Sequence, residues 1–161
     1  MTFLIQLLRF VNLFTAGIIA GGQVMVSMVT LPVMRRWSPG MSLQAHQGML
    51  DKQPDSVMVP AAIICPLSAL AVLVLRRDFG SRSSQFYLAG IAATMVVTVA
   101  SVAFAEPTSV KMRDWPSDNV PAEYPQVRDS WDRIHSVRMV ASLVALGAFI
   151  VGVLSAEGKE S

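Results

Sequence analysis

Charged residues, aromatic residues and cysteine are all scarce in this chain of 161 residues. Asp, Glu, Lys and Arg make up 15% of it, whereas soluble domains have about 25%. The single cysteine, Cys65, excludes an internal disulfide. The net charge of +2, without a dense basic cluster, argues against a nucleic-acid partner. The sequence also has no glycine-rich phosphate loop, Walker motif or Cys-x-x-Cys pair. These absences point away from most soluble enzyme classes.

The chain contains four apolar runs that are long enough to cross a bilayer. They cover residues 10–34, 57–75, 86–105 and 137–155, and a spanning helix needs about 20 residues. The first run is too long for the apolar part of a cleaved signal peptide and should remain as a helix. We therefore predict an all-α integral membrane four-helix bundle, in which residues 1–161 form one four-span domain.

Four spans place both termini on one side of the membrane, together with the short loop 76–84. The two longer loops, 35–56 and 106–136, lie on the other side and carry more basic residues in total, but Arg76, Arg77 and Arg82 make the short loop the denser positive signal. We expect a multi-pass protein of the bacterial inner membrane with both termini in the cytoplasm. Residues 41–52 of the first long loop have the spacing of a short amphipathic surface helix.

Prolines mark several of the expected helix ends. The residue before a proline is pushed away from helical geometry. Pro32 and Pro39 are therefore expected to bracket the end of the first span, and Pro107 to follow the end of the third. Asp129 or Ser130 is expected to cap the start of the last helix.

Polar and small side chains follow one face of the first, third and fourth spans. Offsets of three or four residues place such side chains on one helix face. Lipid tails cannot form hydrogen bonds, so these faces should turn toward each other, either as packing surfaces or around a small molecule. The three stripes are Asn12, Ala16, Ala20, Gln23, Ser27 and Thr30; Thr94, Thr98 and Ser101; and Trp131, His135, Arg138 and Ser142.

Ionisable residues gather where the third and fourth spans meet the long loops. Glu106 and Arg138 are expected to form an ion pair that offsets their burial; the alternative is an arginine that reaches the lipid headgroups and an exposed glutamate. Trp131 is expected to lie in the interfacial aromatic belt. His135 is the histidine of the stripe, and His46 is the only other histidine, so the two are candidate ligands of a metal, haem or pigment.

Two short stretches carry a resemblance to a known family. Glu106-Pro107-Thr108-Ser109 follows the third span, and Trp131-x-x-x-His135-x-x-Arg138 opens the fourth. Together with the four-span layout, they resemble the anthrone oxygenase-like integral membrane family, most of which was long described only as a domain of unknown function. That family often has an asparagine where this chain has Ser109. The resemblance implies oxidation of a lipophilic polycyclic phenol to a quinone by molecular oxygen, with no bound metal, flavin or other cofactor.

The resemblance also implies roles for individual residues. His135 would be the base that forms the substrate anion, because an imidazole titrates near neutrality. Arg138 would hold the developing phenolate. The remaining substrate-binding candidates are Gln23, Ser101, Glu106 and Trp131. The expected partners are membrane lipid and a lipophilic aromatic small molecule, and an enzyme of this kind predicts a closed cavity lined by His135, Arg138 and Gln23.

A second class of function stays open. The chain could be a non-catalytic accessory subunit of a larger redox or photosynthetic membrane complex, with other protein subunits as partners. His46 and His135 would then bind haem or a pigment, or serve only the fold. This reading predicts a large apolar outer face, with His135 bonded inside the bundle or turned toward a partner.

Overall fold

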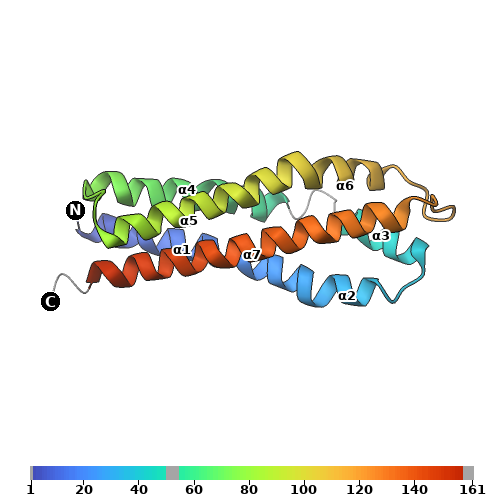
Figure 1. Ribbon diagram of the computed structural model, residues 1–161, viewed down its shortest axis with the longest axis horizontal. Coiled ribbons are helices and arrows are strands. Elements are labelled where there is room, and N and C mark those ends of the chain that lie inside the picture. Colours follow the sequence, from blue (N-terminus) through green and yellow to red (C-terminus); the bar gives the residue numbers. More distant parts are fainter. Residues whose placement is uncertain (1, 50–54, 158–161) are drawn as a thin grey trace.

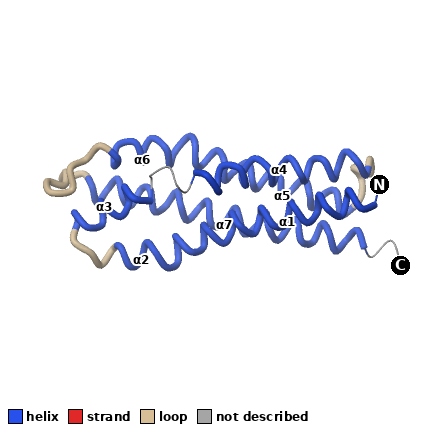
Figure 2. The backbone as a smooth tube through the Cα atoms, turned by 180° about the vertical axis from the view of Figure 1, so that it is seen from behind, coloured by secondary structure: helices blue, strands red, loops and turns tan. Residues whose placement is uncertain are grey.

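The computed structural model describes residues 2–49 and 55–157, which form an elongated bundle of helices (Figure 1). No strand occurs in these residues, and loops join the helices at the two ends (Figure 2). The elements η1 and η2 are π-helical. In chain order the elements are α1 (Thr2–Met25), η1 (Val26–Thr30), α2 (Leu31–Met34), α3 (Pro39–Met49), α4 (Asp55–Arg76), α5 (Arg82–Val99), η2 (Ala100–Ala105), α6 (Glu106–Arg113) and α7 (Tyr124–Glu157).

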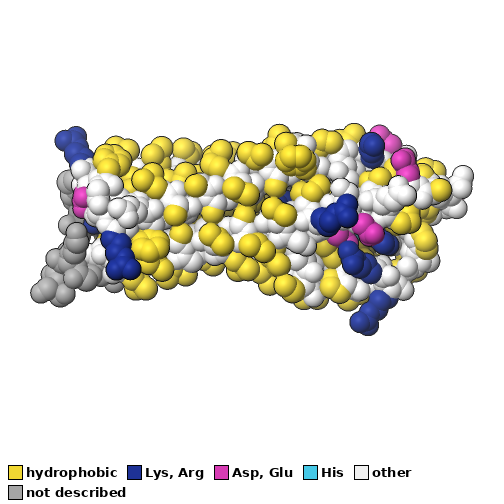
Figure 3. Space-filling view, viewed as in Figure 1, with side chains coloured by type: hydrophobic (Ala, Val, Ile, Leu, Met, Phe, Trp, Pro, Cys, Tyr) yellow, Lys and Arg dark blue, Asp and Glu magenta, His cyan; other side chains and the backbone are white. Residues whose placement is uncertain are grey.

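Four helices are long and apolar enough to cross a membrane, and each contains one of the predicted runs. At most 33% of the residues in their most apolar stretches are buried in the bundle, so most of these residues are at least partly exposed. On the face shown in Figure 3, hydrophobic side chains cover the middle of the molecule, and most charged side chains gather toward its two ends. The predicted four-helix membrane bundle is confirmed. The four candidate spans are Phe3–Met34, Ser56–Arg76, Arg82–Arg113 and Tyr124–Ala156.

One end of the bundle carries additional structure. The start of α1, the end of α7 and the turn between α4 and α5 lie at the opposite end (Figure 1). We call α3, α6 and the loop 114–123 the cap. The 34 residues of α7 extend over about 50 Å at 1.5 Å per residue, whereas the hydrocarbon core is about 30 Å thick. The cap therefore has room to lie beyond the lipid, and α3 confirms the predicted helix of the first long loop as far as Met49. The end of that predicted segment, residues 50–52, lies outside the described residues.

The first span ends at Met34, between Pro32 and Pro39 as predicted, whereas the predicted end of the third span before Pro107 is wrong, because that helix continues to Arg113. Neither Pro32 nor Pro107 interrupts its helix. Each proline lies in the first turn of a short α-helix that follows a π-helical segment directly, η1 before Pro32 and η2 before Pro107. Proline lacks an N–H and its ring collides with the preceding turn of an α-helix. A π-turn shifts the bonding ladder by one residue and accommodates the ring. The predicted cap at Asp129 or Ser130 is also wrong, because α7 begins earlier, at Tyr124.

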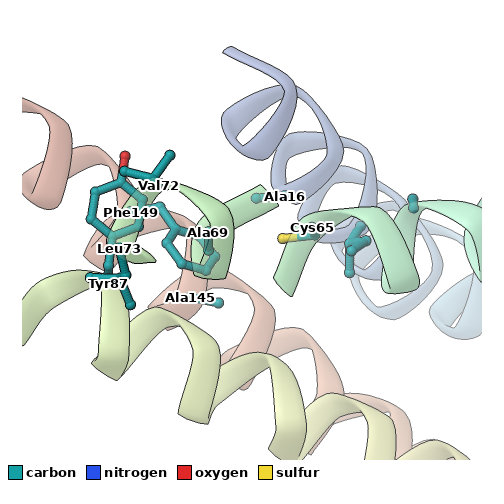
Figure 4. Close-up of a cluster of buried hydrophobic side chains, with 10 residues drawn as sticks. Ala16, Cys65, Ala69, Val72, Leu73, Tyr87, Ala145 and Phe149 are labelled. Carbon is teal, nitrogen blue, oxygen red and sulfur yellow. The ribbon is translucent and has the colours of Figure 1, made fainter. Parts of the chain in front are cut away.

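The membrane core changes in character along the bundle. Near the end opposite the cap, the rings of Tyr87 and Phe149 pack with centroids 5.9 Å apart (Figure 4). Gly90 makes this packing possible, since a Cβ at that position would lie 2.4 Å from the Phe149 ring. Further along, the core narrows to the small buried side chains Ala16, Cys65 and Ala145 (Figure 4).

Candidate functional site

The polar stripes of the three spans meet at common levels of the bundle. A water-sized cavity of about 10 Å³ is lined by Ile19 on α1, Val97 on α5 and Ser142 on α7, which fixes one level. One helical turn is about 3.6 residues. We therefore define two further levels, one turn and two turns closer to the cap, and by their spacing both contain residues of the predicted polar stripes. The first of these levels holds Gln23, Ser101 and Arg138, and the second holds Ser27 and His135.

His135 and Arg138 lack the partners that buried polar groups normally have. His135 is 5% exposed, and neither of its ring nitrogens has a hydrogen-bond partner among the described residues. Arg138 is half-buried, its Nε is buried without a partner, and none of the ion pairs among the described residues includes it. Gln23 Oε1 and Ser27 Oγ are also buried and unpartnered. Such groups are rare because each loses its hydrogen bonds to water. Arg9 Nε, Asn12 Oδ1 and Tyr87 Oη, nearer the opposite end, are unpartnered as well.

Ser101 is the exception among the predicted site residues at these levels. Its hydroxyl donates to the carbonyl oxygen of Val97 at 2.7 Å. This local bond along the helix leaves the oxygen able to accept a hydrogen bond from a ligand.

Trp131 holds the ring of His135. The two rings stack with centroids 4.9 Å apart and an interplanar angle of 21°. The indole Nε1 donates to Ser109 Oγ at 3.1 Å, and that hydroxyl donates to the Ala105 carbonyl at 2.8 Å. Trp131 is only 5% exposed, so its predicted place in the interfacial belt is wrong. Ser109 is thus the residue that orients the indole, and through it the imidazole.

His46 belongs to a second polar group, in the cap. Its Nδ1 lies 3.0 Å from the carbonyl oxygen of Ser42; a carbonyl only accepts, so Nδ1 carries the proton. Tyr124 donates its hydroxyl to Ser42 Oγ at 2.7 Å. Burial lowers the pKa of His46, which keeps this ring neutral at pH 7. The His46 ring stands edge-on to Trp131 at 5.2 Å. Sequence reasoning missed Tyr124, although it lies seven residues before Trp131 and so continues the same helical stripe.

The expected Glu106–Arg138 ion pair is not formed. The helix continues through η2 into α6, and with Ala105 facing inward the next residue points about 100° away. Glu106 is 58% exposed and lies 3.8 Å from Arg113 instead. The buried carboxylate at this end is Asp132, whose Oδ2 accepts from Arg35 Nε at 2.9 Å and Nη2 at 2.7 Å. Sequence reasoning missed this pair because its two members lie 97 residues apart.

A larger hollow lies on the outer face, between α5–η2 and α7. It is an apolar groove of about 460 Å³. Neither this groove nor the water-sized cavity is lined by His135, Arg138 or Gln23, so neither of them is the closed cavity expected around these residues. The lining of the apolar groove includes Met95, Val99, Phe104, Ile134 and Val137.

The family model described as anthrone oxygenase matches residues 51–148, which is more than half of the chain. This chain belongs to the anthrone oxygenase family. The resemblance predicted from the sequence is therefore confirmed, and the match includes Ser109, Trp131, His135 and Arg138. A search of curated proteins and a search of solved structures each find no match. In the described part of this anthrone oxygenase family member, no group of three or more His, Cys, Asp or Glu side chains could hold a metal ion.

Proposed function

We propose that this protein oxidises a lipophilic hydroxyaromatic molecule with molecular oxygen, at the level of His135 and Arg138. The observation that supports this most strongly is the pairing of a buried imidazole, both of whose nitrogens are unpartnered, with a guanidinium that has no counter-ion among the described residues. A buried charge normally has a partner. A phenol or enol would donate its acidic proton to the imidazole, and the phenolate or enolate that remains would supply the missing negative charge.

The chemistry needs one base and one stabiliser of negative charge. His135 removes a proton from the activated carbon of the substrate, and Arg138 stabilises the charge that moves onto the phenolic oxygen. The carbanion forms a carbon–oxygen bond with O₂, and the peroxide takes up a proton. The O–O bond then breaks as the carbon loses its second hydrogen. A CH₂ group and O₂ thus become a carbonyl group and water. Gln23 and Ser101 would orient the ring, and Trp131 would keep the imidazole in place.

Oxygen uptake and quinone absorbance test this proposal. The full chain in lipid nanodiscs is supplied with anthrone, and spontaneous oxidation in empty nanodiscs is subtracted. His135→Gln should lower kcat at least 100-fold, because a general base contributes about 10²–10⁴. His46→Gln makes the same chemical change in the cap and should keep kcat within about threefold. Wild-type turnover no faster than empty nanodiscs across a panel of anthrones and naphthols, or full activity of His135→Gln, would contradict the proposal.

The accessory-subunit hypothesis makes a different prediction, which is tested on protein from the native membrane. Protein purified from its native membrane in mild detergent should show no haem or pigment band and no stoichiometric partner if it acts alone. A haem or pigment band, or a stoichiometric partner, would favour the accessory subunit. Exposed apolar side chains on all four spans fit contact with lipid, and they need no protein partner to cover them.

The orientation in the membrane belongs to the same proposal. The turn between α4 and α5 carries Arg76, Arg77 and Arg82, and we place this end and both termini in the cytoplasm of a bacterial cell. Reporter fusions at the C-terminus and in the loop 114–123 should report opposite sides. A cytoplasmic signal from that loop would reverse the orientation.

A further inference from the structure

We propose that the substrate reaches His135 sideways from the bilayer, through the apolar groove between α5–η2 and α7; this inference rests on the function proposed above. Residues at four-residue spacing form the α5–η2 wall of the groove. The small side chains of Ala92 and Ala100 leave the hollow open, and the larger ring of Phe104 lies at its cap end. The occupant that we assign to this apolar hollow is the lipid-soluble arene of the proposed reaction.

The other wall of the groove adjoins the polar level. Ile134 and Val137 line it from α7. Arg138 follows Ile134 by one helical turn, so the two share a side of the helix, and it is next to Val137 in the chain. His135 is next to Ile134. A molecule in the groove would have to displace the Ile134 and Val137 side chains to bring its hydroxyl to the guanidinium and the imidazole.

In the described part of the chain, the cap closes the alternative route from water at its end of the bundle. Leu43, Met112 and Tyr124 have no exposed surface in the structure. Gln47 fastens α3 to the end of α6, because its Nε2 donates to the carbonyl oxygens of Met112 at 2.9 Å and Trp115 at 2.8 Å. A substrate from the aqueous side would have to open this packed layer, whereas the groove is already open to the lipid.

The groove also narrows the class of substrate. Its volume of about 460 Å³ lies within the range of small-molecule sites, roughly 300–1,000 Å³. None of its lining side chains is charged. We infer that the substrate carries its ionisable hydroxyl on the ring that enters first and no charged or sugar substituent on the trailing ring.

Photocrosslinking tests occupation of the groove without requiring turnover. The full chain in nanodiscs is irradiated with 4-hydroxybenzophenone, and the modified residues are mapped by mass spectrometry. Crosslinks are expected within 92–104 and 134–137 and should fall at least tenfold with excess anthrone, while crosslinks around the lipid-facing Leu67 on α4 stay unchanged. Crosslinks confined to the cap would overturn the proposal. Groove crosslinks that anthrone does not displace would also overturn it, because they would show that the groove is only a surface filled by lipid.

A matched pair of tryptophan substitutions tests entry. Met95 lines the groove and is 48% exposed, whereas Leu67 lies outside it and is 58% exposed. Met95→Trp should lower kcat/KM for anthrone at least tenfold and leave kcat within twofold, and Leu67→Trp should change neither. Equal kinetics for the two variants would overturn lateral entry. If the wild type turns over none of the arenes, the proposed function fails, and the crosslinking still decides whether the groove binds them.

Discussion

Replacing Arg138 by methionine should stabilise the ligand-free protein. A charged side chain at the centre of a spanning helix is disfavoured by about 2.5–3.5 kcal/mol on insertion scales. Arg138 is half-buried and lies at the cap end of the apolar run 137–155, so we expect a gain of about 1–2 kcal/mol. Methionine keeps an unbranched, flexible side chain and removes the charge. No ion pair among the described residues is lost in the exchange.

The assay is reversible unfolding in mixed micelles, with Arg138→Lys as the control that keeps the charge and should match the wild type within about 0.5 kcal/mol. Adding the hydroxyaromatic probe should reverse the order. A ligand at 100 times its Kd stabilises the wild type by about 2.7 kcal/mol, and the methionine variant, which lacks the counter-charge, should gain little.

A loss of stability in ligand-free Arg138→Met would refute the reasoning. Removing one member of a buried ion pair costs about 3–5 kcal/mol. A loss of more than about 1 kcal/mol would therefore mean that the guanidinium already has a partner in the folded protein. It would then be part of the structure and not free to receive a substrate anion.

Three further predictions concern the fold. Gly90→Ala should cost about 1–3 kcal/mol in thermal unfolding because its Cβ would collide with Phe149, whereas Gly17→Ala, with no atom within 4 Å, should not destabilise; equal effects would contradict the packing. Gln47→Ala should speed hydrogen exchange at the end of α6, since it leaves three cap carbonyls without this donor; unchanged exchange would show that these hydrogen bonds are not needed. Because burial lowers the pKa of His46, the unfolded chain takes up its proton first, and stability should fall as the pH drops below about 6.5, by up to about 1.4 kcal/mol per unit. His46→Gln should lose this component, and an unchanged pH dependence in that variant would assign it to another group.

The spans could be predicted because the bilayer imposes a length and a composition that few other environments require. The inward faces could be predicted for the same reason, since polar side chains such as Gln23 and Thr94 have no other place to turn in lipid. Both are buried in the bundle. The sequence therefore predicts well the features that the surrounding lipid imposes on each residue, such as the spans and their inward faces, because these do not depend on which side chains lie nearby.

The details at the cap end could not be predicted. There the helices leave the lipid, and the packing of one helix against another determines where each side chain lies. Trp131 reads as a membrane anchor from its type alone, and only the hydroxyl of Ser109 on another helix explains its burial. Glu106 reads as a partner for Arg138 only if the third span ends at Pro107. Because η2 lets the helix continue, Glu106 turns outward and the predicted pair has no geometry in which to form.

The two π-helical segments support the proposed site by a separate line of argument. A π-turn has poorer backbone bonding than an α-turn and occurs often at functional sites. Both segments of this kind in the described chain, η1 and η2, lie at the levels of Ser27 and His135, one on each of two spans. The unpartnered nitrogens of His135 and the unpaired charge of Arg138 are unfavourable at the same levels. Several unfavourable features at one place, here π-turns and unpartnered polar groups, are expected where a bound ligand supplies the missing interactions.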